Sequence, residues 1–208
     1  MIEKEITGQL VLIMAPSGAG KGFLINHLRT AFEHDPHVHF AVSCTTRVPR
    51  PGEVDGHMYH FITREEFETR MRENDFLEWA EYSGNFYGTP RSEVVMPLRE
   101  GRVVIREVEL QGVLAIRERI PPENRSIIFI DGGPWDVLRE RIIARAPISV
   151  GELELRRERY VEEMSSKAFS DLVIDNSDQH KVELAKERLV NIVKEAIARI
   201  PKREDQLS

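Results

Sequence analysis

A ten-residue segment near the start of the chain has the residue types and spacing of a loop that binds phosphate. Residues 13–22 read IMAPSGAGKG and stand between an apolar run and a helical pattern. In a strand–turn–helix unit of this kind, backbone N–H groups and a helix N-terminus converge where a chain of phosphates can bind. Gly18 and Gly20 let the backbone approach closely, and Lys21 brings charge to the β- and γ-phosphates. The expected loop consists of Ala15, Pro16, Ser17, Gly18, Ala19, Gly20, Lys21 and Gly22.

Two positions depart from the strict pattern of such a loop, G-x-x-x-x-G-K-[ST]. Ala15 stands in place of the first glycine, which is a mild change. Gly22 replaces the Ser or Thr whose hydroxyl is the usual protein ligand to Mg²⁺. The alternative is a glycine-rich turn beside a solvated lysine, with no phosphate site.

Two arginines three residues apart form a second candidate phosphate site. Arg47 and Arg50 lie in the stiff segment TTRVPR, and guanidinium forks hold phosphate oxygens in fixed geometry. Tyr59 and Tyr87 are further candidates for this site. The alternatives are surface arginines and tyrosines that only pack.

Three acidic residues are candidates for reading a base or holding a metal. Glu78 stands in the apolar segment FLEWA, and a carboxylate can accept from the N1–H and 2-amino groups of guanine, which adenine lacks. Glu107 and Glu109 lie near the carboxyl end of an apolar strand, where open α/β sheets bind ligands. The alternative for Glu78 is an outward-facing residue of a half-buried strand. The alternative for Glu107 and Glu109 is that they are acids at a helix N-terminus, where the helix dipole favours negative charge.

Arginines flank residues 146–151, a segment that could act as a mobile lid. Phosphoryl transfer spreads negative charge over the moving group, and arginines that close on it stabilise that charge. The alternative is a solvated charged helix face. The histidines show no convincing metal spacing with Cys44 or with one another. The flanking arginines are Arg139, Arg141, Arg145, Arg156 and Arg157.

These residues must be positioned by strands that alternate with helices. Continuous apolar strands in such an order favour a parallel sheet covered by helices on both faces, which is an α/β fold. The expected strands are residues 10–14, 39–43, 102–108, 126–130 and 172–174. The expected helices are residues 21–33, 111–119, 135–146, 152–169 and 180–200.

The region from about residue 47 to residue 89 interrupts this alternation. A proline-rich turn at 49–52 precedes an alternating pattern at 57–61. A helix follows, for which Thr63 is the expected N-cap and Glu66 completes a capping box. An apolar stretch at 76–82 and an aromatic turn at 84–88 come next. We expect a small inserted α+β lobe that binds the substrate.

Composition limits the classes of function. With 208 residues, the chain is long enough for one domain with a substantial core. A net charge of −6 gives no overall basic field for nucleic acid or an acidic membrane. One cysteine, Cys44, excludes an internal disulfide framework, and we expect it to be a small buried residue rather than a reactive thiol. No signal peptide or bilayer-spanning run is evident, so a cytoplasmic protein is expected.

In several segments the chain resembles the guanylate kinase family, in its bacterial nucleotide-metabolism form. The block SCTTRVPRPGE at 43–53 is the most specific of them, whereas the arginine-rich lid region is weakly specific. The other matching segments are APSGAGK at 15–21, GHMYHF at 56–61, FLEWA at 76–80, GNFYGT at 84–89 and LQG at 110–112.

The resemblance implies a P-loop parallel sheet, an inserted GMP-binding lobe, a helical lid and the reaction of ATP with GMP to give ADP and GDP, with Mg²⁺. In a single domain, the core would be 1–43 and 91–208, the lobe 44–90 and the lid about 141–160. The loop 15–22 would bind ATP, and Lys21, Arg141, Arg145 and Arg156 would be catalytic. ATP and GMP would be the partners, without nucleic acid or membrane, and a homo-oligomer stays open. The GMP-binding residues would be Ser43, Arg47, Arg50, Tyr59, Glu78, Tyr87, Thr89 and Glu109.

Three departures from the family pattern bear on this expectation. Gly22 removes a metal ligand and predicts slower catalysis. The segment REVE at 106–109 stands where an apolar residue and D-x-D are usual; no metal ligand is certain, and Glu107 could hold Mg²⁺ through water. Asp131 starts a DGG turn where a proline-rich turn is usual, and the acid could disturb nucleotide fit. Two alternatives stay open: a catalytically weak binding module, and a kinase of another phosphorylated small molecule.

Overall fold

The computed structural model describes residues 6–50, 52–82, 84–145 and 147–201, and within them a parallel sheet forms the centre of the fold. Its five strands run in the order β2-β7-β1-β8-β9 and all pair in parallel. This confirms the α/β class expected from the sequence. The strands are β1 (Gln9–Met14), β2 (Val38–Phe40), β7 (Val103–Glu107), β8 (Arg125–Asp131) and β9 (Leu172–Asp175).

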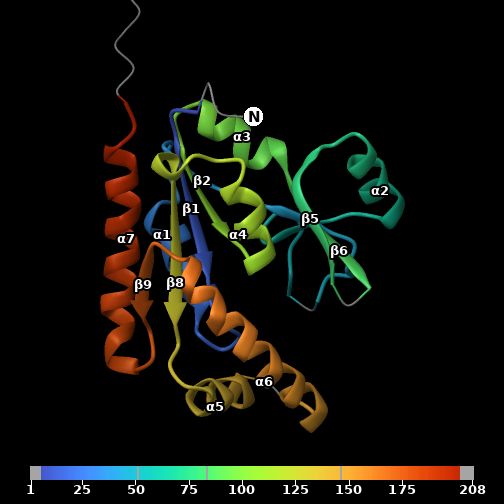
Figure 1. The fold of residues 1–208 in the computed structure, drawn as a ribbon, viewed down its shortest axis with the longest axis vertical. Helices are drawn as coiled ribbons and strands as arrows, with labels where there is room; N and C mark the ends of the chain where they lie inside the picture. The colour runs from blue at the N-terminus through green and yellow to red at the C-terminus, as the bar shows by residue number, and fades with distance from the viewer. Residues whose placement is uncertain (1–5, 51, 83, 146, 202–208) are drawn as a thin grey trace, which may run out of the picture.

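Helices cover both faces of this sheet (Figure 1). Val11 and Ile13 of β1 face an apolar cluster with α1 (Lys21–Ala31) and α7 (Val182–Ala198). Leu10 and Leu12 face a second cluster with α3 (Arg91–Arg99) and α4 (Leu110–Arg117). Because every residue of β1 is buried, its sequence from Leu10 to Met14 is a continuous apolar run rather than an alternating one.

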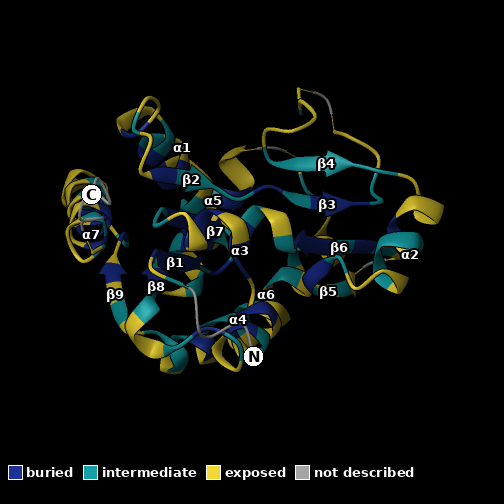
Figure 2. Ribbon diagram, turned by 90° about the horizontal axis from the view of Figure 1, so that it is seen from above, coloured by how far each residue is buried: buried dark blue, intermediate teal, exposed yellow. Residues whose placement is uncertain are grey.

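A second, four-stranded sheet belongs to the inserted lobe, which lies beside the main sheet (Figure 2). Its strand order is β4-β3-β6-β5, with α2 (Arg64–Arg72) packed against it. Thr63 caps α2, since its hydroxyl accepts a hydrogen bond from the backbone N–H of Glu66 at 3.1 Å, as the sequence predicted. The strands are β3 (Ser43–Thr45), β4 (Tyr59–Phe61), β5 (Phe76–Tyr82) and β6 (Asn85–Pro90).

Cys44 lies in the small core of the lobe and has no exposed surface. Three phenylalanines, Phe67, Phe76 and Phe86, make up the rest of this core. Burial raises the pKa of the Cys44 thiol to about 11. The prediction of a buried rather than a reactive cysteine is therefore confirmed.

We predict that the native protein resists alkylation of Cys44. At about pH 8 the raised pKa lowers the thiolate fraction roughly a hundredfold against an ordinary cysteine, and burial blocks access as well. Mass spectrometry after iodoacetamide treatment should show labelling only after denaturation. Labelling of the native chain as fast as the denatured control would contradict the buried placement.

Two helices at the carboxyl end of the main sheet form the region expected to be a lid. They are α5 (Trp135–Arg145) and α6 (Val150–Ser165), and the strand arrows in Figure 1 point toward them. Ser149 caps α6 by accepting from the backbone N–H of Glu152 at 3.2 Å. None of the residues of α6 is fully buried, although Tyr160 and Met164 pack against the two apolar clusters of the core.

Several boundaries differ from the sequence-based expectation. The strand expected at 39–43 is wrong, because the chain crosses there from β2 of the main sheet to β3 of the lobe sheet. The turn expected at 84–88 is largely strand β6, and α3 was not expected at all. The helix expected at 152–169 ends at Ser165 and continues as a 3₁₀ turn (Ser166–Phe169). Pro51 and Ala146, within the expected turn and lid, lie outside the described residues.

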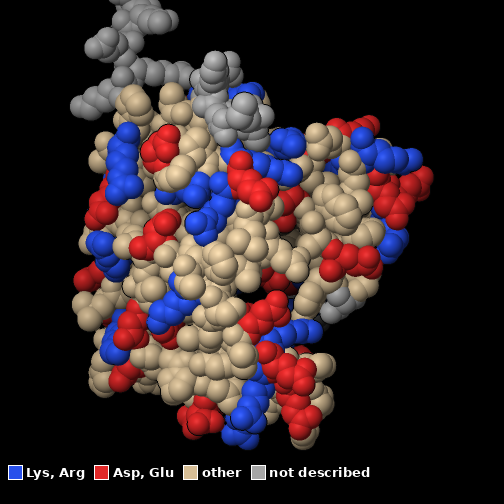
Figure 3. Space-filling view, viewed as in Figure 1, with Lys and Arg blue, Asp and Glu red and all other residues tan. Residues whose placement is uncertain are grey.

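Two further 3₁₀ turns, Pro122–Asn124 and Gln179–Lys181, complete the described elements. Within the described part of the chain, no helix is long and apolar enough to cross a membrane. Charges of both signs are mixed over the face seen in Figure 3, which is hollowed between the main body and the lobe.

Candidate active site

The loop between β1 and α1 has the backbone geometry that the glycine pattern predicts. Gly18 and Gly20 have φ angles of 87° and 84°, in the left-handed region that favours glycine. A Cβ on Gly20 would come within 2.7 Å of Asn176 Nδ2, and one on Gly18 within 3.1 Å of the Leu138 carbonyl oxygen. Glycine is therefore required at both positions by conformation and by close packing.

Three side chains from distant segments hold this loop. Asn176 Nδ2 donates to the carbonyl oxygen of Ala19 at 2.7 Å. The backbone N–H of Ser17 donates to Glu163 Oε2 at 3.0 Å, and Arg156 Nη1 donates to Ser17 Oγ at 3.2 Å. Burial raises the pKa of Glu163, although the Ser17 N–H works against the rise. Sequence reasoning named Arg156 but missed Asn176 and Glu163.

Lys21, the first residue of α1, forms an ion pair with Glu107 at the end of β7. The distance from Nζ to Oε1 is 2.9 Å, and the register Ile13↔Glu107 brings the two strand ends together. The side chain of Glu107 is 37% exposed, so water and a cation can reach it. Glu107 thus lies beside the phosphate loop, where the sequence predicted an acid.

The donor set around Lys21 fits a Mg²⁺ ion that is held mainly by a nucleotide. Among the described residues, no group of three or more His, Cys, Asp or Glu could bind a metal alone. Glu107 offers the carboxylate oxygen that Mg²⁺ prefers, and Mg²⁺ readily keeps water and phosphate oxygens as its other ligands. Gly22 offers no hydroxyl, although a Cβ built there meets no described heavy atom within 4 Å.

Asp131 does not stand as an uncompensated acid near this loop. Its Oδ2 pairs with Lys167 Nζ at 2.7 Å, and its Oδ1 accepts from the backbone N–H of Gly133 at 2.9 Å. The concern that this acid disturbs the fit of a nucleotide is thereby reduced.

At one end of the lobe, Arg47 is surrounded by an acid and aromatic rings. It pairs with Glu53 at 2.9 Å, and its guanidinium lies 5.7 Å from the ring centre of Tyr59. Burial raises the pKa of Tyr59 to about 12, so its hydroxyl stays protonated and can donate to an anion. The ring of Tyr87 lies 5.9 Å from that of Tyr59.

Glu53 orders the turn that carries the second arginine. Besides Arg47, its carboxylate accepts from the backbone N–H of Arg50 at 2.7 Å. Ser43 is the first residue of β3 and pairs in register with Tyr59. The structure therefore brings Ser43, Arg47, Tyr59 and Tyr87 together, and sequence reasoning missed the role of Glu53.

At the other end of the lobe, Glu78 accepts two hydrogen bonds on one oxygen. Thr89 Oγ1 donates to Glu78 Oε1 at 2.6 Å, and Arg106 Nη2 donates to the same oxygen at 2.5 Å. Glu109 is the N-cap residue of α4, and Gly112 of that helix lies against Glu78. The predicted base-reading residues Glu78, Thr89 and Glu109 thus flank one region.

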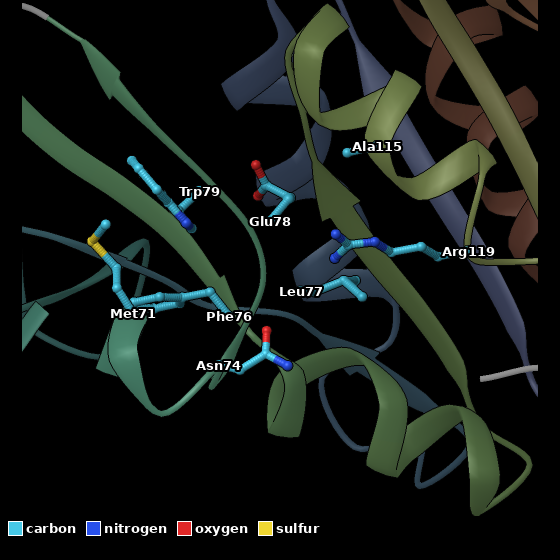
Figure 4. Close-up of a pocket in the computed structure, with 8 residues that line it drawn as sticks. All are labelled: Met71, Asn74, Phe76, Leu77, Glu78, Trp79, Ala115 and Arg119. Carbon is cyan, nitrogen blue, oxygen red and sulfur yellow. The ribbon is translucent and has the colours of Figure 1, made fainter. Parts of the chain in front are cut away.

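A cavity of about 220 Å³ borders Glu78, between α2, β5 and α4 (Figure 4). None of the candidate phosphate-binding residues lines it, so it is separate from the end of the lobe that carries Arg47. Its lining residues are Met71, Asn74, Phe76, Leu77, Glu78, Trp79, Ala115 and Arg119.

The arginines of α5 and α6 differ in how they relate to the loop between β1 and α1. Besides the contact of Arg156 with Ser17, Arg141 Nη1 donates to the carbonyl oxygen of Asn176 at 3.0 Å. Arg145, at the end of α5, is exposed, as are Arg139 and Arg157. Sequence reasoning missed a contact between α6 and the lobe, in which the Arg159 guanidinium lies 4.8 Å from the Tyr82 ring centre.

A phosphate loop on a parallel sheet, an arginine-bearing lobe and basic helices at the strand ends define the class of P-loop phosphotransferases. A family model described as guanylate kinase matches residues 7–196. The chain belongs to the guanylate kinase family.

Individual relatives agree with this assignment over nearly the whole chain. The guanylate kinase of Rubrobacter xylanophilus is 41% identical over 191 residues, which is 92% of this chain and 96% of the relative. The guanylate kinase of a Synechocystis species is 39% identical over 193 residues, which is 93% of this chain and 97% of the relative. A crystal structure of guanylate kinase from Anaplasma phagocytophilum superposes with a TM-score of 0.68 at 28% identity. The superposition covers 96% of this chain and 89% of that one.

Proposed function

We propose that this chain transfers the γ-phosphoryl group of ATP to GMP, which yields ADP and GDP. The observation that carries the proposal is that one lobe sheet holds groups suited to both ends of GMP. Tyr87 and Thr89 are two residues apart on β6 and so share a face. Tyr87 lies with Arg47 and Tyr59, a phosphate-binding set, whereas Thr89 is bonded to Glu78, a reader of guanine.

We infer that catalysis consists of positioning and charge stabilisation. A phosphate oxygen of GMP attacks the γ-phosphorus directly, so no residue needs to act as a covalent nucleophile. Lys21, Arg141, Arg145 and Arg156 would stabilise the charge of the transferring group, and Arg50 would join Arg47 on the GMP phosphate. Mg²⁺, when bound with ATP, would neutralise phosphate charge, and Glu107 would hold it through water.

We also propose how the chain is organised and where it acts. Within one domain, residues 1–43 and 91–208 form the core, residues 44–90 the GMP-binding lobe and residues 141–160 the lid. ATP and GMP are its partners, and it acts without nucleic acid or a membrane surface. The lone buried cysteine is consistent with the reducing cytoplasm.

Base selectivity tests the proposed function. In a coupled assay of ADP release with ATP and Mg²⁺, we expect kcat/KM for GMP to exceed that for AMP by roughly a thousandfold or more. The reason is that AMP leaves the Glu78 carboxylate without its two donors. CMP and UMP should be poor substrates as well. Equal turnover of all four nucleotides, or turnover of none, would contradict the proposal.

Gly22→Ser is predicted to raise activity. A Cβ at this position meets no described heavy atom within 4 Å, and the hydroxyl would supply the missing ligand to Mg²⁺. We expect kcat/KM for MgATP to rise roughly tenfold or more, since one bond to a charged group contributes about 1.5–3 kcal/mol. Gly22→Ala is the matched control, because it adds the Cβ without the hydroxyl. An equal change in both variants would show that the hydroxyl does not act through the metal.

A further inference from the structure

Arg106 occupies a position in β7 where the strand pattern calls for an apolar side chain. Val104 and Val108, two residues away on either side, belong to the apolar cluster between the sheet and α3 and α4. Arg106 pairs in register with Leu12, another member of that cluster. Its side chain is only 7% exposed. A guanidinium buried in such surroundings is unfavourable unless it is paired.

The partner of Arg106 is the candidate guanine reader, Glu78. The ion pair measures 2.5 Å between Nη2 and Oε1, and the side chain of Glu78 is 14% exposed. Arg106 belongs to the main sheet and Glu78 to the lobe sheet, so the pair joins the two sheets. Thr89 fixes the same oxygen from within the lobe. The carboxylate is therefore anchored to the core by one bond and to the lobe by another.

We propose that Arg106 is a positioning residue that sets the preference for guanine by orienting Glu78. This inference rests on the proposed function, in which Glu78 reads the base. Arg106 and Thr89 both donate to Oε1, whereas Oε2 accepts no hydrogen bond from the described residues. Oε2 is thereby left to accept from the N1–H and 2-amino groups of guanine.

The energetics of the pair argue against a purely structural role. Nε and Nη1 of Arg106 are buried without a hydrogen-bond partner among the described residues. Buried ion pairs with incomplete hydrogen bonding are often no more stable than apolar residues of similar size. Replacing both members of the pair by apolar residues should therefore leave the unfolding temperature unchanged or raise it, whereas Arg106→Leu alone should lower it, because it removes the anchor of Glu78 and leaves that buried carboxylate without its counter-ion.

The test compares the binding of GMP and IMP, because IMP lacks the 2-amino group. For Arg106→Leu we expect Kd and KM for GMP to rise roughly tenfold, with kcat changed by less than about threefold. The preference for GMP over IMP should fall by a similar factor. Compared with Arg106→Leu, Arg106→Lys should recover part of the affinity for GMP and part of the preference for GMP over IMP, because a lysine keeps the charge but not the guanidinium fork. Arg188→Leu is the matched control, since Arg188 is half-exposed on α7 and pairs with Glu195.

A double-variant cycle shows whether Arg106 acts through Glu78. In a Glu78→Gln background, Arg106→Leu should have little further effect on the Kd for GMP. The double variant should also unfold at a higher temperature than Glu78→Gln alone, because no buried charge is left unpaired. If Arg106→Leu raised the Kd for GMP by the same factor in the parent protein and in the Glu78→Gln variant, the proposal would be overturned.

Failure of this inference and failure of the proposed function give different results. If the parent protein prefers GMP over IMP and Arg106→Leu keeps the same Kd and the same preference, the role of Arg106 alone is overturned. If the parent protein binds GMP no more tightly than AMP by titration calorimetry, both the proposed function and the inference that rests on it are overturned.

Discussion

Replacing Lys21 with Met is expected to lower kcat for GMP phosphorylation roughly a thousandfold. Removal of one preorganised group that stabilises transition-state charge costs a factor of about 10²–10³, and Lys21 is also the partner of Glu107. Without Lys21, the carboxylate of Glu107 would face the phosphates with its charge uncompensated. Steady-state assays at saturating GMP would measure the loss.

A second lysine supplies the control for this prediction. Lys194→Met makes the same change at an exposed position on α7 and should leave kcat within about twofold. Because Glu107 is partly exposed, Lys21→Met should also keep its fold, which circular dichroism would verify. A Lys21→Met enzyme with more than about a tenth of the parent kcat would contradict the catalytic role.

Glu78→Gln is expected to raise KM for GMP roughly a hundredfold or more and to destabilise the fold. The amide cannot accept from both donors of guanine, and a site with unmatched buried polar groups rejects its ligand strongly. Arg106 would lose its counter-ion, which costs about 3 kcal/mol for a buried pair. For a chain of this size we expect a fall in Tm of about 6–12 °C.

Glu81→Gln is the matched control, because Glu81 lies on the same strand and is exposed. It should change neither Tm nor KM for GMP appreciably. An unchanged KM for GMP in Glu78→Gln would show that another residue reads the base. An unchanged Tm together with a raised KM would show that the Arg106 pair contributes nothing to stability.

The central sheet was largely predictable because its strands are buried on both faces. Continuous apolar runs such as VVI at 103–105 indicate such strands directly. The crossing from β2 to β3 was not predictable, because an apolar run does not reveal which sheet each part joins. Helix α3 escaped notice because it contains Pro97 and two adjacent valines, which are typical of other structures. Its buried face, packed against the sheet, stabilises it nonetheless.

The candidate site residues could be named from short motifs, but the residues that contact them could not. Glycine spacing fixes the phosphate loop locally, so Gly18 and Gly20 could be named from the sequence. The groups that hold the loop come from far along the chain, since Glu163 and Asn176 lie 146 and 157 positions from the residues that they contact. The pairing of Arg106 with Glu78 is likewise a product of packing between two sheets. No observation favours the binding-module alternative or a substrate without a base.

The most direct test of GMP phosphorylation is to follow ATP and GMP with the purified protein by ³¹P NMR. Formation of GDP and ADP in equal amounts, without inorganic phosphate, is the expected result. ADP that accumulates with inorganic phosphate, or GMP that stays unchanged at high protein concentration, would contradict the proposal that this site transfers phosphate to GMP.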